Sequence, residues 1–303
     1  MYKVGVVIVS YNSAEDINDC IKSVLDEGSE LLDVLPVVVD NNSSDKSVSF
    51  ARKSKAVVIE NYKNLGFSKA VNIGVKKALD LASTHILILN PDARLTKGSL
   101  SSLVRCLDSE ESIGAVGPLM IHADGSQANE GYYLKAPSIL TVMCFSTLLR
   151  PWSLRQKFLL RRYEEQSLTT ERSVEQIPGA CLLVERKKLE AIGLLDEDFA
   201  IWFEDVEWSY RARKKGYLLY FCPDAKVIHE GGVSFAKWEG LDKSVTFYVS
   251  MKTFFKKHKI ISYLPIVAVL CLNSFVSFIK SRDRNHLRFI KRFVSQSKGI
   301  LPS

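Results

Sequence analysis

The feature that most constrains this chain is the alternation, in its first third, of short apolar runs with helix-like stretches. The apolar runs are rich in β-branched residues and lie at residues 4–9, 34–39, 56–59 and 86–89. Such runs are typical of strands that are covered on both faces. Helical apolar spacing occurs between them, at residues 14–25, 46–53 and 68–82. This order predicts an α/β fold with a mostly parallel, doubly wound sheet and helices on both faces.

The pattern is looser after another apolar run at residues 113–120. Residues 121–175 contain a turn signal at Asp124-Gly125 and a mixed aromatic and basic stretch. Beyond them we expect strands at residues 179–184, 218–221 and 226–228, and helices at residues 186–192, at 204–215 and from Leu241 onward. With 303 residues and 47% apolar composition, the chain can bury a large core. We expect a main domain over residues 1–240 and a helical, basic C-terminal region over residues 241–303.

Polar side chains follow the first two predicted strands at the point where each strand ends. The first run contains Ser10 and Asn12, and the second begins at Asp40. Capping of the next helix explains either run taken singly. In an open α/β sheet, however, ligands bind at the carboxyl ends of the strands, where both runs meet. Together they can line a nucleoside pocket, in which the Asp40 carboxylate accepts from a base N–H or a ribose hydroxyl.

Several common site types are absent from the sequence. No G-x-G-x-x-G follows the first strand and no G-x-x-x-x-G-K-[ST] loop occurs, which disfavours dinucleotide-dependent dehydrogenases and P-loop kinases or ATPases. The six cysteines are scattered, and no pair has the close spacing of a zinc or redox motif. We therefore expect reduced, mostly buried thiols.

Two further polar sites follow strands later in the chain. The fourth strand runs into Asn90-Pro91-Asp92, where proline ends the strand and leaves Asp92 at the rim. A rim carboxylate suits a hard divalent cation that is held mainly by diphosphate oxygens and water, although a turn-forming aspartate is the plain alternative. His229 precedes a glycine-rich turn and is a plausible second metal ligand only together with Asp92.

A polar helix is predicted to open with Glu204 and Asp205. Acids in a first turn favour the helix dipole, and Glu207 can pair with Arg211 one turn later, so a purely structural role is possible for this helix. In the functional alternative, one of the two leading acids is a general base that takes a proton from a hydroxyl.

Taken together, these segments resemble the glycosyltransferase family 2 enzymes, and most of all the bacterial rhamnosyltransferases that use a deoxythymidine diphosphate sugar. The resemblance covers roughly residues 3–235, and its ordered set of motifs is specific although each piece is weak. The matching pieces are Val9-Ser10-Tyr11-Asn12, Val39 to Asp45, Asn64-Leu65-Gly66-Phe67 with Ala70, Asn72 and Gly74, Leu89 to Asp92, Gly179-Ala180-Cys181, Phe203-Glu204-Asp205 with Arg211, Ala212, Gly216 and Tyr217, and His229 with Gly232 and Ser234.

The resemblance implies a GT-A fold and a role for each matching residue. Ser10, Asn12 and Asp40 would hold the nucleoside; Asn64, Gly66, Asn72 and Asn90 would line the diphosphate and sugar side; Arg211 would contact a sugar; Asp92 and His229 would hold Mg²⁺ or Mn²⁺; and Asp205 would be the base, with Glu204 as the next candidate. The implied reaction is an inverting, in-line displacement at the anomeric carbon. Where this chain has Asn90, the family usually has a second acid.

The C-terminal tail is strongly basic. Residues 251–303 hold eleven Lys or Arg against one acid, Asp283. Within this tail, residues 260–279 are about as long as a membrane span, but basic clusters flank them on both sides, which opposes the positive-inside tendency. We expect a helix lying in the membrane interface, with a span or an ordinary packed helix as alternatives.

The partners follow from the same features. We expect a nucleotide diphosphate sugar donor, a saccharide or lipid-linked acceptor, and a location at the cytoplasmic face of the membrane, because no cleavable signal peptide is visible. No nucleic-acid-binding motif is present. Two rivals remain: a nucleotidyltransferase that makes sugar nucleotides, although these usually carry a glycine-rich basic loop after the first strand, and a non-catalytic carbohydrate-binding protein of the same fold.

Overall fold

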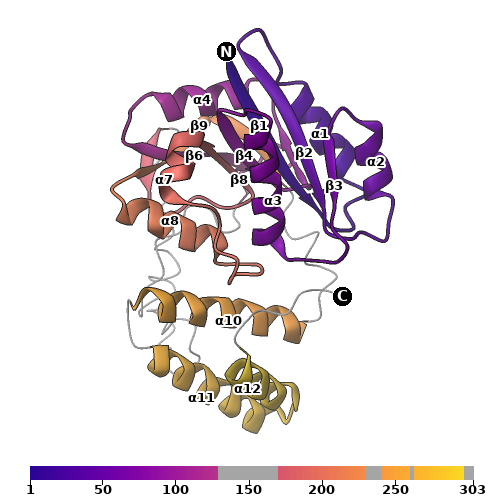
Figure 1. Ribbon diagram of the computed structural model, residues 1–303. Helices are drawn as coiled ribbons and strands as arrows, with labels where there is room; N and C mark the ends of the chain where they lie inside the picture. Colours follow the sequence, from indigo (N-terminus) through magenta and orange to yellow (C-terminus); the bar gives the residue numbers. More distant parts are fainter. Residues whose placement is uncertain (129–169, 230–239, 260–262, 297–303) are drawn as a thin grey trace.

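The computed structural model describes residues 1–128, 170–229, 240–259 and 263–296. Within these residues, nine strands form one sheet in the order β3-β2-β1-β4-β8-β6-β9-β5, with β7 paired to β9 (Figure 1). The strands are β1 (Tyr2–Ser10), β2 (Leu32–Asp40), β3 (Val57–Glu60), β4 (His85–Leu89), β5 (Ala93–Leu95), β6 (Ile113–Ile121), β7 (Arg172–Val174), β8 (Cys181–Glu185) and β9 (Leu218–His229). The helices are α1 (Ile17–Leu25), α2 (Ser47–Lys53), α3 (Phe67–Asp80), α4 (Ser99–Asp108), α7 (Arg186–Ile192), α8 (Glu204–Lys214), α10 (Gly240–His258), α11 (Tyr263–Ser281) and α12 (Asn285–Ser295).

The N-terminal half of the sheet is parallel, as the alternation of apolar runs predicts. Strand β1 pairs in parallel with β2 and with β4, and β2 pairs in parallel with β3. In this register Ser10 lies beside Asp40, which lies beside Glu60. The polar ends of the first two strands therefore meet at one edge of the sheet.

The C-terminal half of the sheet is mixed rather than parallel. Strand β8 runs antiparallel to both β4 and β6, while β5 and β7 run antiparallel to β9. The two strands expected at residues 218–221 and 226–228 are one strand, β9, with a register shift where Pro118 and Leu119 of β6 face Cys222 and Lys226. Such a bulge adds residues to one strand of a pair, so the apolar pattern is interrupted without ending the strand.

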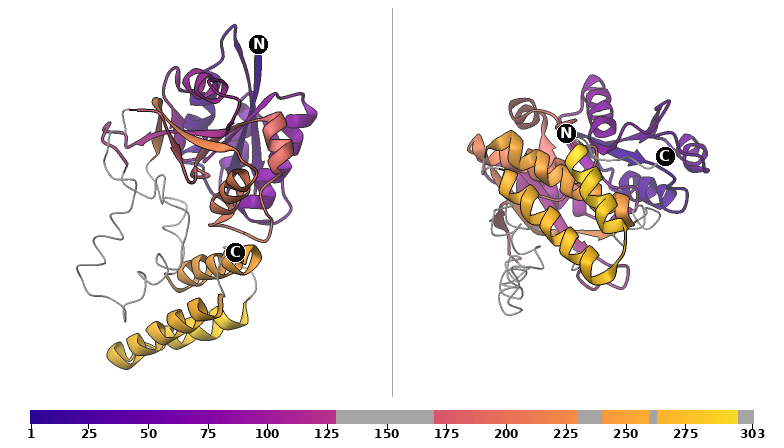
Figure 2. Two further views of the ribbon diagram at one scale, coloured as in Figure 1. Left: turned by 90° about the vertical axis from the view of Figure 1, so that its left-hand side faces the viewer. Right: turned by 90° about the horizontal axis from the view of Figure 1, so that it is seen from below.

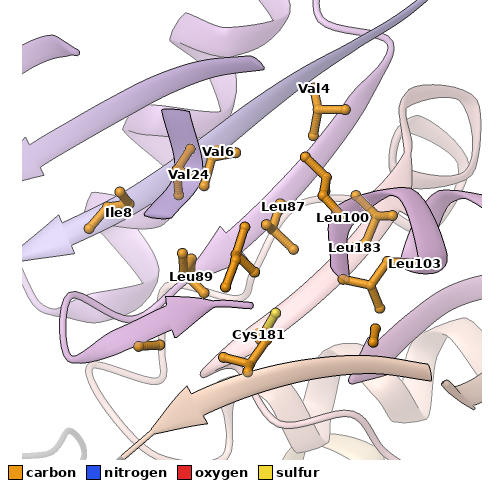
Figure 3. Packing of buried hydrophobic residues seen from close by; sticks show 14 of the residues in the cluster. Val4, Val6, Ile8, Val24, Leu87, Leu89, Leu100, Leu103, Cys181 and Leu183 are labelled. Carbon is orange, nitrogen blue, oxygen red and sulfur yellow. The ribbon is translucent and has the colours of Figure 1, made fainter. Parts of the chain in front are cut away.

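Hydrophobic clusters fill both faces of the sheet. On one face, α1, α2 and α4 pack on residues such as Val6, Ile8 and Leu87, and Figure 3 shows part of this cluster. On the other face, α3, α7 and α8 pack on Val7, Val39 and their neighbours. The sheet is thus covered on both sides, as the continuous apolar strands predict.

The helices α10, α11 and α12 form a layer below the sheet (Figure 1). A third cluster of buried residues joins this layer to Phe199 and Phe203, which precede α8. Among the helices that the structure describes, none is long and apolar enough to cross a membrane. The predicted turn at Asp124-Gly125 is present, since Gly125 N donates to His122 O at 2.9 Å. The remainder of the loosely patterned segment lies mostly outside the described residues, and the boundary at residues 240/241 stays a prediction.

Candidate active site

The turn between β4 and β5 places Asp92 against the end of β9. Ala93 N donates to Asn90 O at 3.1 Å and closes the turn, and Ala93 pairs with His229 across the two strands. As a result, Oδ1 of Asp92 lies 3.3 Å from Nε2 of His229, and their side chains are only 7% and 10% exposed. Within the described part of the chain, Oδ1 of Asp92 accepts no hydrogen bond.

These two groups fit a divalent cation. A buried carboxylate oxygen without a hydrogen bond is costly, and a cation would offset that cost. Carboxylate oxygen and neutral imidazole nitrogen are both common ligands of Mn²⁺-type ions, and carboxylate oxygen suits Mg²⁺. The structure thus brings together the two residues that were predicted to hold a metal, whereas Asn90 contributes its backbone to the turn.

Asp205 is connected to the Asp92 turn through the two residues before β8. Asn90 N donates to Ala180 O at 2.9 Å, and Gly179 N donates to Oδ2 of Asp205 at 3.0 Å. The other oxygen of Asp205 accepts from Val206 N at 2.7 Å. The backbone of Gly179-Ala180 therefore holds the turn that contains Asp92 and the candidate base, Asp205, at the same edge of the sheet.

The adjacent acids Glu204 and Asp205 have different environments. Burial and the nearby Asp205 carboxylate raise the pKa of Glu204 well above its usual value, and its Oε2 accepts no hydrogen bond within the described residues. Burial also raises the pKa of Asp205, but the N–H groups of Gly179 and Val206 act in the opposite direction. Within this pair Glu204 therefore holds a proton more tightly than Asp205, and Asp205 is the more readily ionised of the two.

The backbone just before these acids is in an uncommon conformation. Trp202 and Phe203 have φ angles of 60° and 68°, in the left-handed region that bulky side chains rarely adopt. Such conformations persist only where the surroundings hold them, and they concentrate at functional sites. Here the two residues set the direction in which α8 starts and, with it, the position of Asp205.

The predicted nucleoside residues lie together at the ends of β1 and β2. Ser10 is buried, and its Oγ makes no hydrogen bond within the described residues. Both carboxylate oxygens of Asp40 accept from Ser43, one from its backbone N at 2.8 Å and one from its hydroxyl at 2.5 Å. Asn12, with a φ of 51°, accepts from Ser44 N at 2.9 Å. Asp40 and Asn12 thus shape the loop after β2, and each carboxylate oxygen keeps a lone pair for a ligand.

Two of the predicted residues on the diphosphate side, Asn64 and Asn72, make hydrogen bonds within the protein near α3, and those of Asn72 join α3 to the loop before α8. Oδ1 of Asn64 accepts from Gly66 N at 3.0 Å. The side chain of Asn72 donates to Leu195 O at 2.9 Å and accepts from Leu195 N at 3.0 Å, and it also donates to Glu197. The amide of Asn72 is therefore used within the protein, so the structure supports a positioning role for it instead of donor contact.

Arg211 is also used within the protein. Its guanidinium donates to both oxygens of Glu207, and to the carbonyl oxygens of Ile192 and Leu194 at 2.7 Å each. These contacts tie α8 to the segment that follows α7. The structure favours this holding role over the sugar contact that the resemblance implies.

Sequence reasoning missed how the C-terminal region contacts this site. In α10, Lys257 pairs with Asp196 and Asp198, and His258 Nε2 lies 3.1 Å from Glu207 Oε1. Charge counts alone marked these residues as part of a basic tail. Only the fold shows that the tail stabilises the segment leading to Glu204 and Asp205.

The comparisons with known proteins identify the family of this chain. The family model described as Glycosyl transferase family 2 matches residues 5–193. The chain belongs to this family and is a glycosyltransferase.

Three relatives have more specific names. The low-salt glycan biosynthesis hexosyltransferase Agl10 of Haloferax volcanii is 27% identical over 86% of this chain and 80% of its own length. An N-acetylglucosaminyl-diphospho-decaprenol L-rhamnosyltransferase of Mycobacterium tuberculosis is 28% identical over 64% of this chain and 65% of its own length. The dTDP-rhamnosyl transferase RfbF of Shigella flexneri is 25% identical over 95% of this chain and 92% of its own length.

Solved structures show the same fold. GalNAc-T7 with UDP, GalNAc and Mn²⁺ matches with a TM-score of 0.57 and 20% identity, over 87% of this chain and 52% of that chain. The mannosyltransferase PcManGT from Pyrobaculum calidifontis with GDP-Man and Mn²⁺ matches with a TM-score of 0.54 and 17% identity, over 96% of this chain and 84% of that chain. At these identities the likeness establishes the GT-A-type fold of this chain.

Proposed function

We propose that this glycosyltransferase moves rhamnose from a deoxythymidine diphosphate donor to a saccharide or lipid-linked saccharide acceptor, with inversion, in surface polysaccharide synthesis. The observation that carries the proposal is the link through Gly179-Ala180, which holds Asp205 and the Asp92 turn at one edge of the sheet. The two rhamnosyltransferase relatives favour rhamnose, and the decaprenol-linked acceptor in the name of one of them favours a lipid-linked acceptor.

In this proposal the residues of the site divide the work. Ser10, Asn12 and Asp40 bind the nucleoside at the ends of β1 and β2. Asp92 and His229 hold the divalent cation, which supplies positive charge to the departing diphosphate when it is bound. Asp205, kept ionised by two backbone N–H groups, takes the proton from the acceptor hydroxyl.

Glu204 supports this role of Asp205 by remaining protonated. Two adjacent carboxylates in a buried site do not both ionise readily, so the proton goes to the one with the weaker hydrogen bonding. Oε2 of Glu204 accepts no hydrogen bond within the described residues, whereas both oxygens of Asp205 accept one. The base is therefore Asp205, with Glu204 as its neutral neighbour.

A panel of nucleotide sugars tests the proposal. The purified chain is incubated with dTDP-rhamnose, UDP-, GDP- and other dTDP-sugars, with Mg²⁺, Mn²⁺ or a chelator, and with prenyl-diphosphate saccharide acceptors. We expect a metal-dependent rhamnosyl product of inverted anomeric configuration, measured by mass spectrometry and NMR. Transfer from another donor would reject the rhamnose assignment, and sugar-1-phosphate turnover with a nucleoside triphosphate would favour the nucleotidyltransferase. Donor binding without any turnover would favour the carbohydrate-binding protein.

A further inference from the structure

The outward face of α11 carries a stripe of exposed apolar side chains. We call it the α11 stripe, and it consists of Ala268, Leu272, Phe275 and Ile279. Their spacing places them on one side of the helix. Leu272, Phe275 and Ile279 are 54%, 47% and 50% exposed, which is unusual for three large apolar side chains in a row. Leu270, on another side of the helix, belongs to the same buried cluster as Phe289 and Phe293 of α12.

Exposed cations lie beside this stripe. Arg282 and Arg284 follow α11 directly, and Arg288 and Lys291 are exposed on α12. Exposed apolar residues of α12, Leu287 and Val294, occur among them. Seen from below, α11 and α12 run side by side as the outermost layer of the molecule (Figure 2). The α11 stripe and these cations are thus exposed side chains of one helix pair, and we call the exposed side of this pair the α11–α12 surface.

We propose that the α11–α12 surface docks on an anionic lipid bilayer. An apolar helix face with flanking Lys and Arg is the combination that inserts at the boundary of headgroups and acyl chains. The charge argues against a second copy of the chain as the occupant, because self-association through this surface would bring its arginines together. Residues 282–292 contain five Arg or Lys and one acid, Asp283, and of the five, Arg292 pairs with an acid of α10, Asp242. Negative lipid headgroups complement that charge.

This docking would place the candidate active site near the bilayer. The α10 helix lies between the docking surface and the sheet, and Ser250 Oγ of α10 donates to Ile201 O at 3.0 Å. Phe203 packs on Phe254 of α10 with 5.9 Å between ring centroids. Both contacts reach the residues just before Glu204 and Asp205. A lipid-linked acceptor would therefore meet the site from the membrane side, a point that rests on the proposed function.

Vesicle binding tests the docking without any sugar transfer. The full chain is mixed with phosphatidylcholine vesicles, or with vesicles in which about a third of the lipid is phosphatidylglycerol, at low and high salt. We expect sedimentation with the anionic vesicles and weakened binding at high salt. Replacing Arg284, Arg288 and Lys291 by Gln should weaken binding roughly 100-fold, because each cation near an anionic surface contributes about fivefold.

The α11 stripe is tested by a matched pair of variants. Leu272→Asn/Phe275→Asn/Ile279→Asn should reduce anionic vesicle binding by at least about 10-fold. Leu31→Asn/Tyr62→Asn, at apolar positions of the sheet domain that are even more exposed, should leave it unchanged. The proposal is overturned if the wild type ignores anionic vesicles, or if the stripe variant only converts a dimer to a monomer in sedimentation analysis. Hydrolysis of the nucleotide sugar donor, measured without vesicles, tests the proposed enzyme activity independently of membrane docking.

A second inference rests on a different group of side chains, which the sequence keeps far apart. Cys106 in the last turn of α4, Cys222 in β9 and Glu171 just before β7 place their ligand atoms within 4.8 Å of one another. Both thiols are buried and the carboxylate is exposed. We propose that these three residues bind a borderline-soft divalent cation such as Zn²⁺, separately from the Asp92 and His229 pair.

The ligand atoms of Cys106, Glu171 and Cys222 are of the kinds that bind Zn²⁺. Thiolate and carboxylate are both zinc ligands, and a Zn–S bond is about 2.3 Å, so two sulfurs at this separation need only a small approach. The ion would join α4, β9 and the start of β7, three elements that are distant in sequence.

Metal titration of the tag-free, metal-stripped chain tests this site. We expect one Zn²⁺ per chain that survives a weak chelator, and a thiolate-to-metal absorption band with Cd²⁺. Both signals should be lost in Cys106→Ser/Cys222→Ser and kept in Cys271→Ser. Glu171→Gln, at an exposed position, should weaken binding about 10-fold and gives a readout if the double variant fails to fold. Equal binding by the wild type and the folded double variant would overturn the proposal, as would a Cys106–Cys222 disulfide in the purified protein.

Discussion

Oδ1 of Asp92 lies 3.3 Å from Nε2 of His229, although one residue follows β4 and the other ends β9. The contact exists because Ala93 and His229 are paired across β5 and β9. A carboxylate and an imidazole in this position can share one cation, which is how a site with Asn90 in place of a second acid can still hold a metal.

Asp92→Asn should lower metal-dependent transfer by about 100-fold or more, since it removes the only charged ligand in the pair. The half-saturating concentration of Mn²⁺ should rise with it. The measurement is kcat/KM over a Mn²⁺ titration, with Asp19→Asn, at an exposed acid on α1, as the control. An unchanged Mn²⁺ dependence in Asp92→Asn would remove this residue from the metal site.

Asp205→Asn should reduce kcat by a factor of about 10² to 10⁴, the usual contribution of a general base. Donor affinity should remain, because the amide can still accept from Gly179 N. Glu204→Gln should cost much less, since burial and Asp205 raise the pKa of Glu204 and favour its neutral form, which glutamine imitates. Single-turnover transfer and donor binding by calorimetry measure the two effects. A larger loss in Glu204→Gln than in Asp205→Asn would reverse the assignment of the base.

The parallel half of the fold could be predicted from the sequence because its signal is local. Strands β1, β2 and β4 are continuous apolar runs, and α1, α2 and α3, which lie between the first four strands, have helical apolar spacing. The predicted bounds of these elements therefore agree with the structure to within a few residues. The approach of Ser10 to Asp40 follows from parallel pairing alone.

The mixed half could not be predicted, because strand direction depends on where the chain returns to the sheet. Strand β8 inserts antiparallel between β4 and β6, and the residues just before it, Gly179 and Ala180, connect Asp205 to the Asp92 turn. Strands β5 and β7, of three residues each, are too short to show a period. The contact of Cys106 with Cys222 and the holding role of Arg211 likewise depend on tertiary neighbours.

Gly74→Ala should destabilise the fold by about 1–3 kcal/mol, the usual cost of overpacking a core. A Cβ at Gly74 would lie 2.4 Å from Cγ1 of Val7 and 3.0 Å from Cγ2 of Val39, where α3 crosses β1 and β2. Urea unfolding measures the change. Gly28→Ala, where the nearest atom would be Leu25 O at 3.4 Å, is the control and should be close to neutral. A stabilised Gly74→Ala would mean that α3 can move away from the sheet.

The pKa of Glu204 predicts how stability changes with pH. Burial and Asp205 raise that pKa above its ordinary value of 4.5, so the folded chain keeps a proton that the unfolded chain has released. The free energy of unfolding should therefore decrease as the pH rises from the ordinary to the raised pKa. Glu204→Gln stays neutral and lacks this decrease. The Tm of Glu204→Gln should therefore rise relative to the Tm of the wild type as the pH increases above about 4.5. Parallel Tm curves for the two chains would contradict the raised pKa, and Glu30→Gln, at an exposed position, should follow the wild type.

The variant Arg211→Met distinguishes two possible roles of Arg211: holding α8 in place, or contacting a sugar of the substrate. Glu207 is 1% exposed, so removing its partner leaves a buried carboxylate, and the carbonyls of Ile192 and Leu194 also lose their donor. We expect a loss of roughly 3 kcal/mol in unfolding free energy, at the low end for a broken buried pair because His258 still contacts Glu207. The KM for the donor should change little in the folded fraction. Arg213→Met, which removes a more exposed arginine paired with Glu175, should affect neither quantity. If instead KM rises about 10-fold while urea unfolding is unchanged, Arg211 contacts a sugar, and its hydrogen bonds to the 192–194 segment rearrange when the donor binds.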